Sequence, residues 1–273
     1  MLTAGTLTVD VGCTFAYEVS VPTPAVFMVR PIGSQAQRIV DERWNAEPAA
    51  PYRDYVDLYG NVCRRATLPG GHSSLRYDAR VEVPDALDAA DPAAVQHPVD
   101  DLPDEALVYT LPSRYCLSDV LGDEAWRLFA ATPPTYERVQ AICDHVHDTI
   151  RFAYGTSLPT TTAADVLSDG VGVCRDFAHL AISFARAMNV PARYVFGYLP
   201  DIDVPPPYAP MDFCAWFEAY LGGRWWTFDP RNNERRRGRV VIARGRDALD
   251  VAMVTTYGGA TLHDMVVRAD RSV

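Results

Sequence analysis

Residues 211–230, MDFCAWFEAYLGGRWWTFDP, constrain the fold of this chain more than any other segment, because they specify a β-hairpin with a fixed register. Gly222 and Gly223 stand between two strand-like runs, and a type I′ turn requires positive φ at both of its central positions. Such a turn pairs Leu221 with Arg224. The segment therefore predicts two antiparallel strands whose pairing follows from the turn alone.

The same register predicts which hairpin side chains lie on one face. When the pairing continues from the turn, Trp216 lies opposite Asp229 and Cys214 lies opposite Arg231. These four side chains share a face because side chains alternate along a strand. Cys214 and Asp229 then become diagonal neighbours, with backbones roughly 7 Å apart. A three-residue turn would break this arrangement.

A second cysteine stands at the predicted start of a helix. Residues 169–189 open with an Asp-Gly turn, and Phe177, Ala181 and Phe184 then recur at helical spacing. Cys174 falls in the first turn, where the helix dipole favours an exposed anion by about 0.3–1 kcal/mol. The sequence therefore predicts a helix that presents a thiol at its N-terminus.

The order of strand and helix patterns predicts an α+β chain with three regions. Residues 1–85 alternate like strands and predict a β-rich N-terminal domain, with Cys13 and Cys63 in its core. Residues 86–118 are rich in Pro, Asp and Ala and predict a linker. Residues 119–273 carry helical patterns followed by strands and predict the second domain.

Composition excludes several classes of partner. The formal charge is −10 and the pI is about 5.0, which argues against nucleic acid and against a membrane surface as partners. The start of the chain alternates like a strand, and no apolar run approaches a bilayer span of about 20 residues. We therefore expect a soluble, cytoplasmic protein. The basic run Arg235–Arg237 with Arg239 is expected to be a solvated loop, with binding of a substrate carboxylate as the alternative.

Taken together, these segments resemble the bacterial transglutaminase-like, or papain-like, cysteine enzyme superfamily. The resemblance rests on PSRYC, GVCRDFAHL, ARYVFGYL and the hairpin AWFEAYL-GGRW-TFDP, and it covers residues 119–273. It implies a papain-like transglutaminase core, with helices packed on an antiparallel sheet, preceded by a β-sandwich-like domain.

The resemblance also implies roles for particular residues. In this superfamily a helix cysteine is the nucleophile, a hairpin histidine is its base, and an aspartate on the next strand orients the histidine. Cys174 matches the nucleophile and Asp229 the aspartate, but Cys214 stands at the histidine position. His179 lies five residues along the helix from Cys174 and does not replace the missing base by sequence.

Three chemistries remain open for Cys174, Cys214 and Asp229. A zinc ion could take two thiolates and a carboxylate and keep one position for water, as catalytic zinc sites do. Alternatively, Cys174 could act as a nucleophile without an imidazole partner. Finally, the two sulfurs could form a disulfide or be inert. Trp216 and Tyr208 are candidate substrate-binding residues beside this cluster.

These observations predict a hydrolase or acyl-transfer enzyme that acts on amide C–N bonds through the Cys/Cys/Asp cluster, with Zn²⁺ as its candidate cofactor. Its expected substrate is a small amide, a peptide or a protein. The alternative is a transglutaminase-like domain that has lost catalysis and serves as a binding or structural module. Replacement of the histidine by a cysteine, a reactive and metal-binding residue, favours the enzyme.

Overall fold

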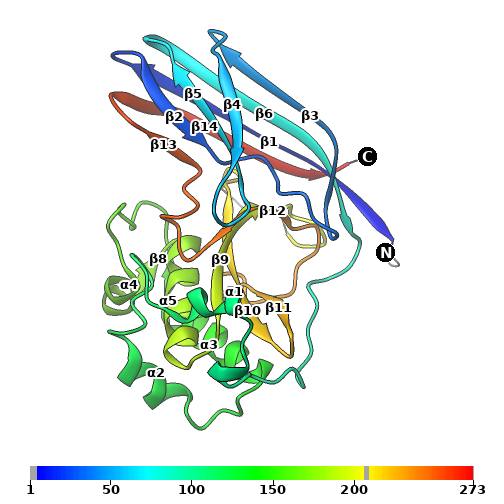
Figure 1. Ribbon diagram of the computed structural model, residues 1–273, viewed down its shortest axis with the longest axis vertical. Coiled ribbons are helices and arrows are strands. Elements are labelled where there is room, and N and C mark those ends of the chain that lie inside the picture. The colour runs from blue at the N-terminus through cyan, green and yellow to red at the C-terminus, as the bar shows by residue number, and fades with distance from the viewer. Residues whose placement is uncertain (1–4, 206–208, 273) are drawn as a thin grey trace.

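The computed structural model describes residues 5–205 and 209–272, and it divides into a β-rich part and a part that combines helices with a sheet (Figure 1). The β-rich part contains two four-stranded sheets, and the mixed part contains a third. Helices lie on one side of that third sheet. This arrangement agrees with the predicted α+β class.

The first sheet of the β-rich part runs in the order β14-β1-β6-β3, with every pair antiparallel. Its strands are β1 (Thr6–Val19), β3 (Arg38–Glu47), β6 (Gly71–Pro84) and β14 (Ala260–Arg271). Buried residues recur at every second position along most of β1 and β6, as a strand with one face on a core requires. The alternation seen in the sequence is therefore confirmed.

The second sheet runs in the order β13-β2-β5-β4 and faces the first. Its strands are β2 (Thr23–Phe27), β4 (Tyr52–Val56), β5 (Val62–Leu68) and β13 (Val254–Thr256). Phe15 of β1 and Phe27 of β2 bring their ring centroids within 6.0 Å, which joins the two inner faces. Cys13 and Cys63 are buried there, as predicted. The β-rich part is thus sandwich-like.

The last strands of the chain belong to these two sheets and not to the helical part. β14 pairs with β1 along most of its length, and β13 pairs with β2. The prediction that residues 119–273 form one core is therefore wrong for residues 254–271. An alternating pattern shows that a segment is a strand, but it does not show which sheet edge the segment will complete.

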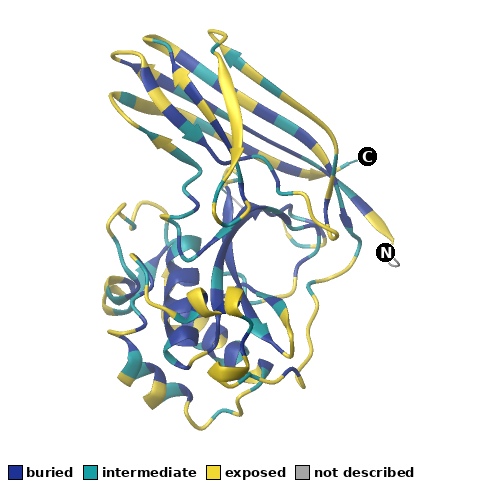
Figure 2. Ribbon diagram, viewed as in Figure 1, coloured by how far each residue is buried: buried dark blue, intermediate teal, exposed yellow. Residues whose placement is uncertain are grey.

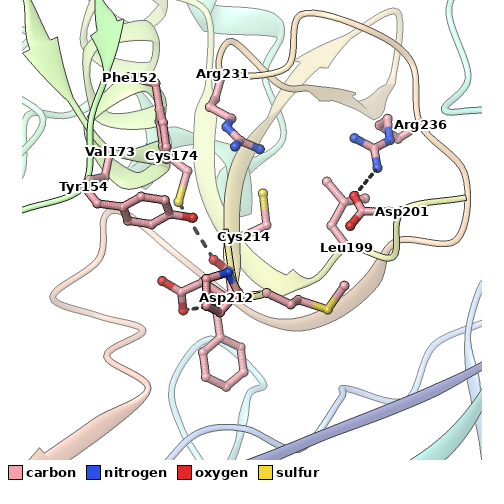
Figure 3. A pocket seen from close by; sticks show the side chains of 13 residues that line it. Phe152, Tyr154, Val173, Cys174, Leu199, Asp201, Asp212, Cys214, Arg231 and Arg236 are labelled. Atoms are coloured by element: carbon pink, nitrogen blue, oxygen red, sulfur yellow. Dashed lines mark hydrogen bonds and ion pairs between the residues drawn. The ribbon is translucent and has the colours of Figure 1, made fainter. Parts of the chain in front are cut away.

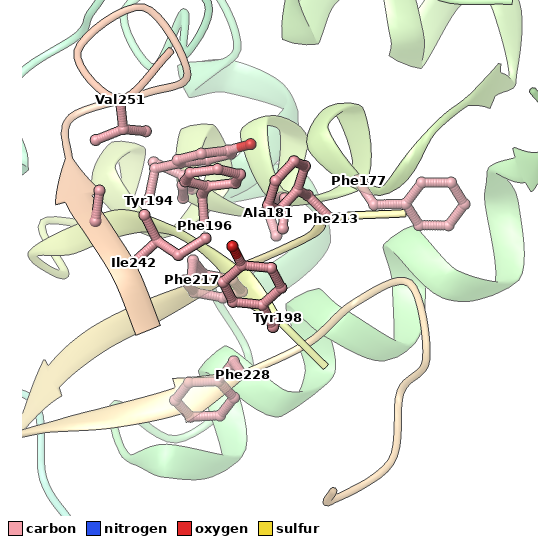
Figure 4. Close-up of a cluster of buried hydrophobic side chains, with 14 of the residues drawn as sticks. Phe177, Ala181, Tyr194, Phe196, Tyr198, Phe213, Phe217, Phe228, Ile242 and Val251 are labelled. Atoms are coloured by element: carbon pink, nitrogen blue, oxygen red, sulfur yellow. The ribbon is translucent and has the colours of Figure 1, made fainter. Parts of the chain in front are cut away.

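The core sheet runs in the order β11-β10-β9-β12 and is also antiparallel. Its strands are β9 (Ala192–Tyr198), β10 (Cys214–Leu221), β11 (Arg224–Phe228) and β12 (Val240–Gly245). Helix α5 (Cys174–Ala187) packs on β9 and β10. Phe177 and Ala181 of α5 lie in a buried cluster with Phe217 and Phe228 of the hairpin (Figure 4). Figure 2 shows α5 and this sheet as the most continuously buried part of the molecule.

Short elements connect the two parts and surround α5. They are η1 (Val99–Asp101), α1 (Asp104–Leu107), η2 (Val108–Thr110), α2 (Gly122–Phe129), α3 (Tyr136–Thr149), β7 (Arg151–Phe152), α4 (Ala163–Asp169) and β8 (Val171–Gly172). The helices predicted after residue 118 correspond to α2 and α3. The predicted linker 86–118 carries η1, α1 and η2, so it is partly structured.

The hairpin has the register that the turn predicts. Leu221 pairs with Arg224 and Phe217 with Phe228, and the φ angles of Gly222 and Gly223 are 56° and 82°. A residue with a Cβ is strained at such angles, which explains both glycines. The type I′ interpretation is confirmed.

Two side-chain amides hold the β-rich part against the edge strand β12. Gln37 donates to the carbonyl of Val241 at 2.7 Å and accepts from its N–H at 2.8 Å. Asn61 makes the same pair of bonds with the backbone of Arg244, both at 2.8 Å. Both amides therefore satisfy backbone groups that an edge strand leaves unpaired.

Candidate active site

Cys174 is the first residue of α5, and its position is fixed by the turn before it. The carboxylate of Asp176 accepts a hydrogen bond from the N–H of Val173 at 2.9 Å, which caps the helix. A Cβ at Gly172 would lie 2.8 Å from Asp176 Cβ, so only glycine allows this close approach. Cys174 is partly exposed. The predicted helix start is confirmed.

Cys214 lies beside Cys174 at the start of β10. Both sulfurs border one pocket, and the guanidinium of Arg231 points toward the space between them (Figure 3). Cys214 is buried, with 8% of its surface exposed, and its thiol lies 3.8 Å from the carbonyl of Ala215. The structure therefore brings together the two cysteines that sequence analysis selected.

The two thiols differ in acidity. A hydrogen bond from Cys214 lowers the pKa of Cys174, and the N–H of Ala215 and the charge of Arg231 lower it further, against the effect of burial. The same hydrogen bond, together with burial and the nearby charge of Asp229, raises the pKa of Cys214 well above its ordinary value. Cys174 is therefore the more acidic thiol of the pair, and Cys214 is the less acidic one.

Asp229 follows β11 and lies in a buried ion pair. Its carboxylate accepts from the guanidinium of Arg239 at 2.9 Å and from the side chain of Asn232 at 2.8 Å. Arg239 also donates to Asp88 at 2.8 Å. Asp229 lines neither of the two pockets that Cys174 borders. Asp229 therefore lies near Cys214 but outside the pockets that the two cysteines line.

These donors do not fit a metal ion. Within residues 5–205 and 209–272, no three His, Cys, Asp or Glu side chains are grouped closely enough to hold one. Both oxygens of Asp229 already accept hydrogen bonds, one from the N–H of Asn232 and the other from the Asn232 side chain and Arg239. The predicted three-ligand zinc site of Cys174, Cys214 and Asp229 is therefore corrected, and no step below involves zinc.

The two candidate substrate-binding residues have different outcomes. Trp216 is fully buried and lines neither pocket; the guanidinium of Arg239 lies 4.8 Å from its ring centroid. The expectation that Trp216 contacts substrate is thus corrected, because its face of the hairpin is covered by Arg239. Tyr208 lies outside the described residues.

The solvated loop expected for the basic run is found at Arg235, which is exposed, but not at Arg236 or Arg239. Arg236 is buried and bonds to the carbonyl of Pro200 at 3.0 Å and to Asp201 at 3.3 Å. The side chain of Arg239 is only 6% exposed. Four arginines close together indicated solvent, but carboxylates from distant segments neutralise these two in the interior.

Two pockets meet at Cys174. Their volumes are about 150 Å³ and 470 Å³, and Val173, Cys174, Asp212, Phe213 and Cys214 line both. The smaller pocket adds polar residues, among them Arg231 and Asp201. The larger one adds apolar residues from β9 and from the segment before β13. A substrate could therefore extend past the thiol in both directions.

No histidine of the described chain lines either pocket. His179 is fully buried, with its ring against those of Tyr115 and Tyr194, and its Nε2 accepts a hydrogen bond from the N–H of Ala248 at 3.1 Å. His147 contacts the carbonyls of Pro230 and Arg231 at 3.2 and 3.1 Å. The missing imidazole is therefore not supplied from elsewhere in the described fold.

Sequence analysis did not select Asp212 and gave Arg231 no role, and both line the smaller pocket with Cys174. The register predicted that Arg231 shares a face with Cys214, so a signal for it was present. Asp212 lies before the first paired residue of β10, where no strand pattern fixes the direction of a side chain.

A helix that begins at a cysteine and packs on an antiparallel sheet, with a hairpin cysteine and aspartate beside it, defines a papain-like thiol-enzyme fold. The chain belongs to the transglutaminase-like superfamily, whose core matches residues 125–230. Residues 10–84 match the bacterial transglutaminase-like N-terminal region. The recognition made from the sequence motifs is thus confirmed.

Relatives cover nearly the whole chain. A crystal structure of a candidate cysteine protease from Cytophaga hutchinsonii is 32% identical, covers 97% of this chain and 91% of its own, and superimposes with a TM-score of 0.89. An uncharacterised protein of Mycobacterium leprae is 27% identical over 88% of this chain and 89% of its own length. One of Mycobacterium tuberculosis is 30% identical over 81% and 77%. The superfamily match and the similar crystal structure support an enzyme of the cysteine-protease or acyl-transfer kind.

One further finding concerns membranes. Among the helices that the structure describes, none combines the length and the apolar character needed to cross a bilayer.

Proposed function

We propose that this chain is a hydrolase or acyl transferase that acts on amide bonds with Cys174 as its nucleophile. The observation that carries the proposal is the pairing of two unlike thiols. Cys174 is partly exposed, starts a helix and has a lowered pKa, while Cys214 is buried and keeps its proton. A thiolate, not a thiol, is the reactive species.

The proposed reaction has two steps. The thiolate of Cys174 attacks the carbonyl carbon of an amide; a C–S bond forms, the C–N bond breaks, and the amine leaves with one added proton. Water then attacks the thioester and releases the acid, or a second amine accepts the acyl group. The Cys214 thiol and the cation of Arg231 stabilise the thiolate in place of the imidazolium.

The pockets favour a small amide or a peptide segment as substrate. Polar groups of the smaller pocket and apolar groups of the larger one flank Cys174, so both sides of a scissile bond have a surface to contact. The formal charge of −10 gives no support to nucleic acid or an anionic membrane as partner.

One observation favours a second candidate, a domain that has lost catalysis and binds its partner without reacting. Cys214 occupies the place of the imidazole, and a thiol with a raised pKa is a poor base near neutral pH. The two candidates differ in a property that can be measured, the reactivity of Cys174.

The test is acylation of the purified, reduced protein by 4-nitrophenyl acetate, followed by peptide mapping of the acetyl group. We expect a burst of nitrophenol and an acetyl group on Cys174, both absent in Cys174→Ser. Cys63→Ala is the matched control, because it removes a buried thiol of the β-rich part. If the parent protein is acylated no faster than Cys174→Ser, the enzyme proposal fails and the binding module is favoured.

A further inference from the structure

We infer that Asp212 is the proton-transfer residue of this site, donating a proton to the leaving group in the first step and accepting one from water in the second. The inference rests on the proposed function and supplies what it lacks, an acid and base in place of the histidine.

The position of Asp212 suits this role. It lies two residues before Cys214 and lines both pockets together with Cys174. Figure 3 shows its carboxylate on the side of the pocket that holds Cys174 and Tyr154, across from Arg236. Its one recorded hydrogen bond, at 2.7 Å, comes from the N–H of the next residue, Phe213. One carboxylate oxygen is therefore open to a reacting group.

The other titratable groups of the smaller pocket are less suitable. Asp201 lies 3.3 Å from Arg236 and is held as an ion pair. Burial raises the pKa of Tyr154, which moves that phenol further from neutral pH. Among the described residues, no Arg, Lys or His lies within ion-pair distance of Asp212. It is thus the one carboxyl of these pockets that has no charged partner in the described chain.

Asp212 is exposed to solvent, and the partial desolvation of its carboxyl acts in the direction that acid catalysis needs. Desolvation raises the pKa of its carboxyl, and the negative charge of Asp212 opposes ionisation of Cys174. The charged or titratable groups that border the two pockets are Tyr115, Tyr154, Cys174, Arg175, Tyr194, Asp201, Cys214, Arg231 and Arg236.

The proton balance is as follows. With Cys174 as thiolate and Asp212 as carboxylic acid, attack forms the C–S bond and the Asp212 proton passes to the leaving atom as its bond to carbon breaks. Asp212 is then a carboxylate. It takes a proton from the water that attacks the thioester, and the Cys174 thiolate is released as the leaving group.

Esters with different leaving groups test this role. 4-Nitrophenol leaves as an anion and needs no proton. 4-Methoxyphenol resembles tyrosine, with a pKa of about 10, and needs a proton in order to leave. We expect Asp212→Asn to be acylated by 4-nitrophenyl acetate within about twofold of the parent rate. Acylation by 4-methoxyphenyl acetate should slow by about tenfold or more, since general acid catalysis contributes about 10²–10⁴-fold.

A second readout separates chemistry from damage to the fold. Because Asp212 raises the pKa of Cys174, Asp212→Asn should be alkylated by iodoacetamide at Cys174 as fast as the parent at pH 7, or faster. Asp123→Asn, an exposed acid on α2, is the matched control and should change neither rate. A disturbed fold would slow alkylation and both esters together.

The outcomes distinguish this inference from the proposed function. Equal slowing of both esters in Asp212→Asn, or no slowing of either, overturns the role of Asp212 and leaves Cys174 as the nucleophile. If neither ester acylates Cys174 in the parent protein, the proposed function fails, and the role of Asp212 fails with it.

Discussion

The carboxylate of Asp229 lies 2.9 Å from the guanidinium of Arg239, and both side chains are almost fully buried. Arg239 reaches on to Asp88, in the segment that joins the two parts of the molecule. The aspartate that would orient a histidine elsewhere in the superfamily therefore has a cation as its partner. This ion pair joins the end of the hairpin to the linker and covers Trp216.

Breaking this ion pair should destabilise the protein. Arg239→Ala leaves two buried carboxylates without their cation, and removing one partner of a buried pair costs about 3–5 kcal/mol. Urea denaturation followed by circular dichroism measures the loss. Arg38→Ala is the control, because Arg38 is two-thirds exposed in its pair with Glu82 and should cost about 0–1 kcal/mol. Equal losses in the two variants would contradict a structural role for Arg239.

Removing the Cys214 thiol should make Cys174 less reactive. The hydrogen bond from Cys214 is the largest influence that lowers the pKa of Cys174, so Cys214→Ala raises that pKa and reduces the thiolate fraction at neutral pH. The rate of iodoacetamide labelling at Cys174, plotted against pH, should move to higher pH. Cys143→Ala, a buried thiol of α3, should leave the curve in place. A curve that stays or moves lower in Cys214→Ala refutes the pairing.

Introducing a histidine at the hairpin position should raise activity. An imidazole with a pKa of about 6.5 is largely neutral at pH 7 and can accept a proton. A thiol of raised pKa still holds its own proton at that pH and cannot accept another. We expect Cys214→His to be acylated by 4-nitrophenyl acetate at pH 7 about tenfold faster or more. Cys214→Gln, which supplies a polar side chain that cannot titrate, is the control. Similar rates in both variants would show that Asp229, held by Arg239, cannot support an imidazole.

The amide of Gln37 should contribute to the joint between the two parts. Gln37→Ala leaves the N–H of Val241 unpaired on the edge strand, while its carbonyl keeps the bond from the N–H of Ile32; a buried unsatisfied group costs about 1–3 kcal/mol. Thermal denaturation should show the loss. Gln35→Ala, which removes an exposed amide, should stay within about 0.5 kcal/mol of the parent. No difference between the two would mean that water replaces the Gln37 bonds.

Ending the chain after Met253 should unfold more than its last strands. β14 pairs with β1 along most of its length, so its loss leaves one backbone edge of this long central strand unpaired. We expect the shortened chain to bind a hydrophobic dye and aggregate. Ending the chain at Arg271 is the control and should be harmless. A shortened chain that stays monomeric and melts cooperatively would show that β14 is dispensable.

Local sequence determined the parts of this protein that a short segment can specify. Gly222 and Gly223 fixed the hairpin register because few other residues adopt their backbone angles, and the pairing follows that register as far as Phe217 and Phe228. The helix start at Cys174 follows in the same way from the turn before it. Several such segments, taken in their order along the chain, resemble motifs of the superfamily, and this resemblance predicted the superfamily and the fold.

Tertiary structure alone decided which partners these segments meet. Arg239, which looks solvated in sequence, binds the carboxylates of Asp229 and Asp88 in the interior, because burial of a charge depends on counter-charges from distant segments. β14 pairs with β1 because a sheet edge accepts any strand of compatible register, wherever it lies along the chain. Asp212 lies beside Cys174 only because β10 and α5 pack together, and no local pattern encodes that distance.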